Sequence, residues 1–526
     1  MKTRNNFFKK ILSTILVCLI LLPVLTMACF AAQGSKYPTI YIPGRNEDTL
    51  VDDVSSENPQ NIKVDFEVDI STFASSLVPL IINEQWDEYC ETLNGLVSPM
   101  FDSVTLDNNG NVKDNSGVIF PFDTTTVKKL TYMDYTYKLD TYKFQYDYRL
   151  DPYENAKILD EYVKCVMEVT GAEKVNILGR CEGSNIALAY LEKYGDPSFI
   201  NHILFVWPSV YGLCGVTAFF TGEISVDMNA LEAFLKSEKG ESSLGDITTT
   251  MVQVMNSMNA LSPAANIFNS IYAKIEKQLM PDLILDTYGN MPSFWAMIDP
   301  DKYQQAREYV FSGREEEYSG LIEKIDNYQN KAGSKVEEIL ARYTDAGTMF
   351  SCIAKYGYMI TPLCTEYMNA QTDGLATLEA SSLGATVADF GKTLSSGYIN
   401  DAITKGNGKY ISPDKSIDAS TCLYSDSTWF VKNCEHASMP SSLNTLCAAL
   451  VACESQPTVF QSSRYPQFML YDKRAGVLVQ LTEDNNIENA DSDNNSNSND
   501  NVSKGFFERI ADFFRNLFEK IKNIFK

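Results

Sequence analysis

The chain is long and acidic, and both properties limit what it can be. It has 526 residues and a formal net charge of −24 at pH 7. A surface of that charge repels phosphate groups, so nucleic acid is excluded as a partner. Hydrophobic residues make up 44% of the chain, which is enough to build a large buried core.

The first 32 residues have the layout of a secretory signal peptide. Residues 1–10 carry four basic side chains, residues 11–27 are apolar, and Ala31 and Ala32 offer a cleavage site. Two alternatives remain open. Cys29 follows Ala28 as in a lipidation site, and the apolar run is nearly long enough to stay in a bilayer as an anchor. The sequence therefore predicts a secreted or extracellular protein that is free or associated with the cell surface.

Two of the 12 cysteines lie in this leader, and the other ten lack the Cys-x-x-Cys spacing that is typical of structural zinc. Cys422 could pair with Cys434, and Cys447 with Cys453, although a reducing habitat would leave them as thiols. We expect neither a metal nor a cofactor.

Residues 36–482 read as one α/β unit. Its first strand, around residues 38–42, enters a loop at Gly44. A second strand, around residues 144–150, precedes a helix that starts at Asp151 and has apolar side chains at helical spacing.

The next apolar run, residues 175–178, leads into Gly-Arg-Cys-Glu-Gly and then into a helix. A strand that turns into a helix through Gly-x-Cys-x-Gly has the form of a nucleophile elbow, whose tight turn needs small residues around its apex. Gly179 and Gly183 meet this need, and Cys181 is the apex. The bland alternative is a chance match in which the cysteine is only a small hydrophobic residue.

This segment resembles the α/β-hydrolase superfamily, in which the apex is usually serine. The resemblance implies a mostly parallel sheet flanked by helices. It also implies an oxyanion hole formed by the backbone N–H groups of Glu182 and Arg45. An ordinary strand-end turn at Gly44 is the alternative for the second donor.

Two further segments are similar to lecithin:cholesterol acyltransferase-like lipases. Residues 146–149 read Tyr-Asp-Tyr-Arg where those lipases have Tyr-Asp-Trp-Arg, and Pro292-Ser293 resembles their Pro-Ser segment. The resemblance implies a lipid or small ester as substrate. We expect Asp147 and Arg149 to form a structural ion pair.

After a buried strand at residues 202–207, the periodicity is helical to about residue 389 and rich in methionine. The resemblance implies that this insertion, about residues 208–390, is a helical cap. Most of its methionines are expected in the core and a few in a substrate tunnel.

Only two histidines can serve as the base. His202 begins a strand, whereas active sites of parallel sheets lie beyond the carboxyl ends, so His436, which follows a strand at residues 428–431, is predicted as the base. The acid is expected after the preceding strand, and Asp414 is predicted, with Asp418 and Asp426 as fallbacks.

The last 44 residues differ from the rest. Residues 483–503 are mostly Asn, Asp, Ser and Glu, as in a disordered linker, and residues 504–526 form an amphipathic pattern with six basic and three acidic side chains. We expect this C-terminal helix to bind an anionic membrane or the cell envelope. Docking on its own domain or self-association is the alternative.

Together these features predict a carboxylic ester hydrolase, lipase-like, with Cys181 as nucleophile, His436 as base and Asp414 as acid. Two alternatives stay open. The same triad would serve an acyltransferase, and a chain without activity could bind lipid or envelope as a pseudo-hydrolase.

Overall fold

The computed structural model describes residues 35–45, 50–64, 80, 83–120, 141–225, 227, 261–360 and 363–484. The predicted signal peptide, the C-terminal helix and nearly all of the linker between residues 483 and 503 lie outside the described residues. No helix in these described ranges is both long and apolar enough to cross a membrane.

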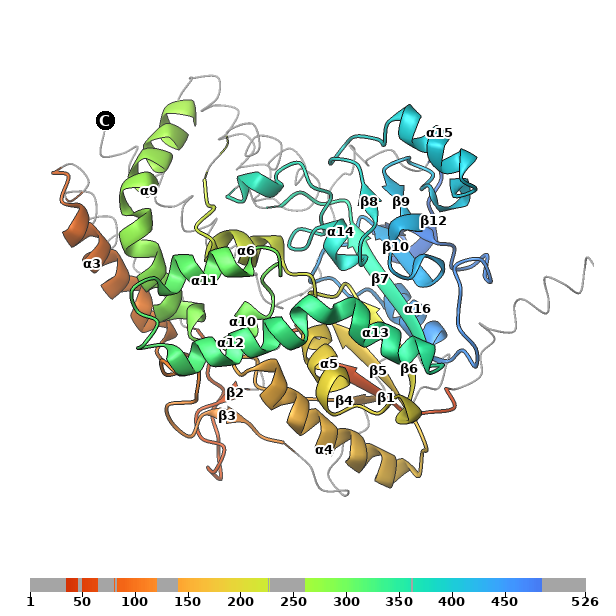
Figure 1. Cartoon of the computed structure of the whole chain (residues 1–526), viewed down its shortest axis with the longest axis horizontal. Coiled ribbons are helices and arrows are strands. Elements are labelled where there is room, and N and C mark those ends of the chain that lie inside the picture. The colour runs from red at the N-terminus through yellow and green to blue at the C-terminus, as the bar shows by residue number, and fades with distance from the viewer. Residues whose placement is uncertain are drawn as a thin grey trace, which may run out of the picture.

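The protein has an α/β architecture built on an eight-stranded sheet in the order β12-β11-β10-β7-β6-β5-β1-β4 (Figure 1). All neighbouring strands are parallel except β11 and β12, which are antiparallel. The strands of this sheet are β1 (Thr39–Ile42), β4 (Thr141–Lys143), β5 (Val175–Arg180), β6 (Ile200–Val206), β7 (Met349–Tyr356), β10 (Thr428–Lys432), β11 (Phe468–Asp472) and β12 (Val477–Gln480). Two small antiparallel pairs join β2 (Leu50–Val51) to β3 (Gly117–Val118) and β8 (Thr386–Val387) to β9 (Ile417–Asp418).

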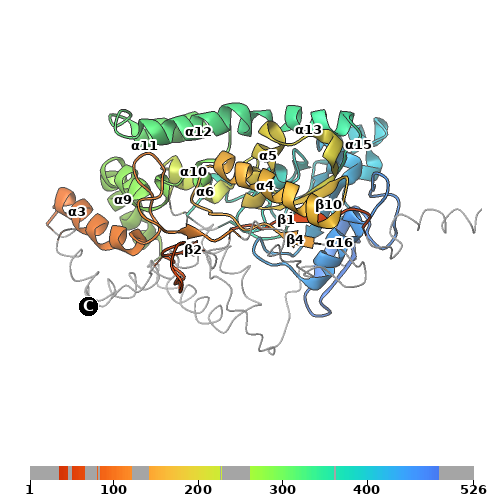
Figure 2. The ribbon, with the colours of Figure 1, turned by 90° about the horizontal axis from the view of Figure 1, so that it is seen from below.

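Helices lie on both faces of the sheet. Figure 2 shows α4 and α5 on one side, with α12 and α13 beyond them, and α16 on the other side. The helices are α3 (Trp86–Val97), α4 (Pro152–Thr170), α5 (Glu182–Lys193), α6 (Cys214–Phe220), α9 (Leu261–Ile284), α10 (Pro292–Trp295), α11 (Tyr303–Phe311), α12 (Ser319–Lys331), α13 (Val336–Asp345), α14 (Leu378–Ser381), α15 (Ser396–Thr404) and α16 (Ser441–Val451).

The sheet is buried on both faces because helices cover both. Successive side chains of its central strands point to opposite sides and so pack into two different cores. Ile40 and Ile177 pack into the core beneath α4 and α5. Tyr41 and Leu178, one residue further along, pack against α16 in a second core. Central strands of this kind are mostly apolar, and the short apolar runs in β1, β5, β6 and β10 made these four strands visible in the sequence.

Helix α4 begins and ends at the predicted residues. The Asp151 carboxylate accepts a hydrogen bond from the Tyr153 N–H at 3.1 Å, and Pro152 occupies the first turn. Gly171 ends the helix in the left-handed conformation, with φ 65°. These capping groups hold α4 against the sheet beside α5.

The prediction of helix from residue 208 to about 389 was wrong in one decisive place. Residues 349–356 form β7, which lies between β6 and β10 in the middle of the sheet. All eight of its residues are buried, and such a short, fully buried run cannot be distinguished from a buried helix by periodicity. The helices between β6 and β7 therefore end with α13.

Candidate active site

The tight strand-to-helix turn predicted at Cys181 is present. Strand β5 ends at Arg180, α5 begins at Glu182, and Cys181 between them has φ 48° and ψ −125°. A side chain at positive φ is strained, and such strain persists only where the surroundings enforce it. The turn holds the Cys181 side chain at the carboxyl end of the sheet.

The glycines of the elbow are required by close backbone approach. A Cβ at Gly183 would lie 2.3 Å from the carbonyl oxygen of Ile42 and 2.4 Å from that of Pro43. A Cβ at Gly179 would lie 2.9 Å from the Cα of Ser184. No side chain tolerates contacts this short, so both positions need glycine if the helix is to start so close to β1.

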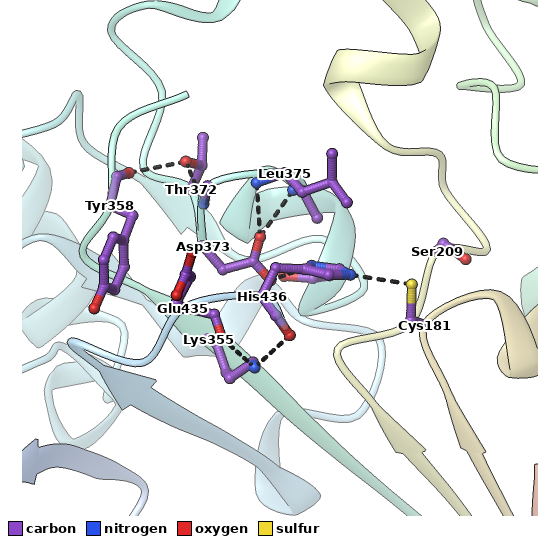
Figure 3. A network of polar contacts seen from close by, with 12 residues as sticks. Cys181, Ser209, Lys355, Tyr358, Thr372, Asp373, Leu375, Glu435 and His436 are labelled. Atoms are coloured by element: carbon purple, nitrogen blue, oxygen red, sulfur yellow. Dashed lines mark hydrogen bonds and ion pairs between the residues drawn. The ribbon is translucent and has the colours of Figure 1, made fainter. Parts of the chain in front are cut away.

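His436 lies beside Cys181, as the sequence predicted. Its Nε2 is 3.0 Å from the Cys181 Sγ, although the two residues are 255 positions apart in the chain (Figure 3). The histidine comes from the loop that follows β10, and β5 and β10 both end at this edge of the sheet. A ring nitrogen at this distance can exchange a proton with the sulfur.

The other ring nitrogen of His436 contacts Asp373, which was not among the acids predicted from the sequence. The distance from Nδ1 to the Asp373 Oδ2 is 2.7 Å. The other carboxylate oxygen, Oδ1, accepts hydrogen bonds from the N–H groups of Leu375 and Ala376 at 3.1 and 2.8 Å, which fixes the carboxylate (Figure 3). The backbone N–H of His436 also donates a hydrogen bond to the backbone carbonyl of Asp373 at 2.8 Å.

The predicted contact between Asp414 and His436 was wrong. Asp414 instead forms an ion pair with Lys432, at 3.0 Å between Nζ and Oδ2, and accepts hydrogen bonds from Ser412 and Ser416. The fallbacks are also engaged elsewhere, because Asp418 accepts a hydrogen bond from Tyr398 and Asp426 accepts one from Tyr410.

Asp373 was not predicted as the acid because β7 was not predicted as a strand. It lies in the loop after β7, and an acid that orients the histidine is expected at the carboxyl end of a neighbouring strand. Once residues 349–356 are read as a strand, Asp373 becomes a candidate because it lies in the segment between β7 and α14, where Asp-Gly at 373–374 indicates a turn.

The contact between His436 and Asp373 shifts the pKa values of both side chains. Burial alone would lower the pKa of His436, but the neighbouring Asp373 and Cys181 outweigh it and raise that pKa to about 10. Burial alone would likewise raise the pKa of Asp373, whereas His436 and Lys355 lower it. At neutral pH the His436 ring is therefore protonated and lies between the carboxylate and the sulfur.

His202, the other histidine, lies apart from this cluster. It is fully buried near the amino end of β6, and its Nε2 is 3.0 Å from the Ser351 Oγ. Burial lowers its pKa to about 3, so the ring is neutral. The prediction that His202 lies toward the amino end of its strand is confirmed.

The two residues predicted to supply oxyanion donors lie on either side of the elbow. Glu182 is the first residue of α5, and the loop after β1 brings Gly44 next to Cys181: a Cβ at Gly44 would lie 3.2 Å from the Cβ of Cys181. The Tyr146 hydroxyl donates to the Pro43 carbonyl at 3.1 Å and so supports this loop.

Polar side chains brace the first turn of α5 from behind. The Ser184 hydroxyl donates to the Cys181 carbonyl at 2.5 Å and accepts from the Ser209 N–H at 3.1 Å. The Asn185 amide donates to the Ala296 carbonyl at 2.8 Å. These bonds tie the elbow to the segments after β6 and α10, so the apex is held from several elements.

The expected ion pair between Asp147 and Arg149 is present and buried. The guanidinium Nη2 lies 2.8 Å from the Asp147 Oδ2, and Nη1 donates to the Ser116 Oγ at 3.0 Å. The pair supports the loop before α4, and the Ser293 hydroxyl donates to the Tyr148 carbonyl in the same loop.

All ten cysteines of the described residues are free thiols, and Cys181 alone among them is partly exposed. Neither of the two local disulfides considered from the sequence is formed. In the same part of the chain, no group of three or more His, Cys, Asp and Glu side chains is arranged to hold a metal ion.

A scan against protein-family models and a search of curated proteins each returned no match.

Proposed function

We propose that this protein is an α/β-hydrolase that cleaves carboxylic esters, and lipid acyl esters in particular, by acyl transfer to Cys181. One observation carries the proposal: His436 reaches the Cys181 Sγ through Nε2 and the buried Asp373 carboxylate through Nδ1. Acyl-transfer enzymes use this arrangement, in which a nucleophile contacts a base and the base contacts an acid that orients it.

In the resting pair the proton of the Cys181 thiol is held on His436 Nε2. In the first half of the reaction, the Cys181 sulfur therefore attacks the ester carbonyl carbon as a thiolate, and a C–S bond forms as the carbonyl π bond opens. The resulting oxyanion is held by the backbone N–H groups of Glu182 and Arg45. Collapse of this intermediate breaks the C–O bond, and the Nε2 proton of His436 passes to the departing alkoxide. The products are an alcohol and a thioester on Cys181.

In the second half, neutral His436 takes a proton from water, and the hydroxide attacks the thioester carbonyl. Collapse breaks the C–S bond, releases the carboxylic acid and restores the protonated histidine beside the sulfur. Asp373 keeps the ring in one orientation and stabilises its positive charge in both halves.

The wider architecture is consistent with this assignment. A mostly parallel sheet carries the elbow at its carboxyl edge, as in the α/β-hydrolase fold that the sequence resembles. In that fold the helices between β6 and β7 would act as a cap. The preference for lipid esters rests on the similarity of residues 146–149 and of Pro292-Ser293 to acyltransferase-like lipases.

We further propose that the protein is exported and attached to an anionic membrane or to the cell envelope. The proposal rests on the leader-like residues 1–32 and on the basic, amphipathic pattern of residues 504–526. Attachment would place the ester-cleaving domain next to lipid substrates.

The test is to incubate the protein with p-nitrophenyl esters and glycerol esters of increasing acyl length, beside Cys181→Ala and Cys181→Ser. We expect turnover by the native protein and an intact mass raised by one acyl group when the ester is in excess. Cys181→Ala should show neither. Equal turnover by Cys181→Ala, or no turnover of any ester by the native protein, would overturn the proposal. Products that form only when an alcohol acceptor is added would replace hydrolysis with acyl transfer.

A further inference from the structure

Lys355 is a cation buried directly beneath the loop that carries His436. It is the penultimate residue of β7 and pairs with Val431 of β10, so it lies at the carboxyl edge of the sheet. Its exposed fraction is 0%. A fully buried lysine is uncommon, because removing an ammonium group from water is costly unless its hydrogen bonds are replaced.

Every hydrogen bond of this ammonium group goes to the histidine loop. Nζ donates to the carbonyl oxygens of Glu435, His436 and Ser438 at 2.5, 2.8 and 2.9 Å, as Figure 3 shows in part. An ammonium group has three donors, so all of them are used. Three carbonyls within four residues can converge on one point only if the loop bends around it.

The Trp207 ring completes the surroundings of this ammonium group. Nζ lies 3.4 Å from the ring centroid, within the range of a cation–π contact. Trp207 directly follows β6, and its backbone N–H donates a hydrogen bond to the Ile353 carbonyl of β7. Burial lowers the pKa of Lys355 to about 8, which leaves the group charged at neutral pH. The position of the Lys355 ammonium group is thus fixed by residues of β7 and of the segment after β6, independently of the loop that carries His436.

We propose that Lys355 is a positioning residue of the triad: its ammonium group fixes the backbone of residues 435–438 and thereby holds the His436 ring between Asp373 and Cys181. The proposal rests on the proposed function, because it assigns a role to a residue that acts through His436. Among the described residues, the hydrogen bonds of the Lys355 Nζ go to backbone carbonyls of the loop and not to the Cys181 sulfur or the Asp373 carboxylate, although its charge also lowers the pKa of Asp373.

The chain offers a matched control in Lys432. This residue ends the neighbouring strand β10 and forms an ion pair with Asp414, and its side chain is 16% exposed. Lys432→Met therefore also removes a largely buried ammonium group at the same edge of the sheet. It leaves the three bonds between Lys355 and the histidine loop in place.

The experiment compares Lys355→Met and Lys432→Met with the native protein in three measurements that need no substrate. These are stability in urea, the pKa of the His436 ring by NMR, and the rate at which iodoacetamide alkylates Cys181 at pH 7. For Lys355→Met we expect the alkylation rate to fall about tenfold or more, because small displacements of a catalytic group have effects of this size. We also expect the His436 pKa to fall toward its ordinary value of about 6.5. Lys432→Met should lose stability but keep both site properties.

A folded Lys355→Met protein with unchanged alkylation rate and unchanged His436 pKa would overturn the proposal. If the methionine variant does not fold, Lys355→Arg takes its place, and its larger head group should displace the loop with the same two effects. Failure of both variants to fold while Lys432→Met folds would assign Lys355 to stability alone. A native protein in which Cys181 resists alkylation would instead contradict the proposed function.

Discussion

Arg45 and Glu182, whose backbone N–H groups we assign to the oxyanion hole, are also joined through their side chains. The Arg45 Nε lies 3.5 Å from the Glu182 Oε2, and the Glu182 side chain is almost completely buried. The guanidinium carbon also lies 3.8 Å from the centroid of the Phe294 ring. The pair therefore links the loop after β1 to the first turn of α5.

The first prediction follows from this link. Glu182→Gln keeps the shape of the side chain but removes its charge, so the loop at Arg45 is held less firmly. We expect kcat for ester cleavage to fall about tenfold with little change in KM, because the oxyanion exists only beyond the ground state. Steady-state kinetics on a soluble ester measures both constants.

Arg307→Gln is the control, because it breaks a partly exposed ion pair with Asp326 on α12, distant in the chain from the elbow. It should leave kcat unchanged. If Glu182→Gln lowers stability while kcat stays at the native value, the link between the two donors has no catalytic role.

The second prediction separates the two candidate acids. Asp373→Asn removes the charge beside His436 and reverses the hydrogen bond that fixes the ring, so kcat/KM should fall by about 10² to 10⁴. Asp414→Asn should leave kcat/KM within about twofold and instead lower the free energy of unfolding by roughly 3 kcal/mol, because Lys432 loses its partner. Kinetics and urea unfolding on both variants decide between them, and the opposite pattern would restore Asp414 as the acid.

The sequence was sufficient to locate the parts of the site that depend on local chain geometry. The elbow requires Gly179 and Gly183 for steric reasons, so its pattern is visible in a few consecutive residues. His436 could be found by elimination because the chain holds only two histidines and His202 stands at the wrong end of its strand.

Asp373 could not be found in this way, because its selection depends on knowing which strand precedes it. The run at residues 349–356 contains a single β-branched residue, Ile353, and Lys355 interrupts it, so its pattern does not favour a strand. Tertiary contacts decide the matter: the run is completed as a strand by its neighbours β6 and β10. The role of Lys355 is hidden for the same reason, since its partners are backbone carbonyls of another segment.

The third prediction concerns the two histidines, which should titrate at opposite extremes. NMR of the ring nitrogens should give a pKa of about 10 for His436 and about 3 for His202. His202→Gln assigns the signals, and Asp373→Asn should bring the His436 pKa down, because it removes the carboxylate that raises it. Equal titration of both rings near 6.5 would contradict the contacts described for His436.

These pKa values also determine how stability depends on pH. The raised pKa of His436 stabilises the folded protein fully below about 6.5, and this contribution is lost as the pH rises through about 10. The lowered pKa of His202 acts in the opposite sense: its contribution is complete above about 6.5 and is lost as the pH falls toward 3. Urea unfolding of Asp373→Asn should therefore show a weaker alkaline dependence, and also a weaker acid dependence because the lowered pKa of Asp373 itself is lost; His202→Gln should weaken the acid dependence alone.

The fourth prediction concerns the C-terminal segment, residues 504–526, which lies outside the described residues. Its pattern combines a large apolar face with an excess of basic side chains, which suits the surface of an anionic bilayer. Deleting residues 504–526 should release the protein from vesicles containing anionic lipid, as measured by co-sedimentation. Turnover of a soluble short-chain ester should not change, because the polar residues 483–503 separate the segment in the chain from the α/β domain, to which we assign the activity.

A charge variant distinguishes membrane binding from docking on the protein's own domain. Changing Lys520 and Lys522 to glutamate keeps the apolar face but removes the basic excess, so binding to anionic vesicles should fall strongly while binding to neutral vesicles stays weak throughout. Raising the salt concentration should weaken the native protein's binding in the same direction. Equal co-sedimentation of the full-length, truncated and charge-changed proteins would exclude the anchor and favour a helix that packs on its own chain.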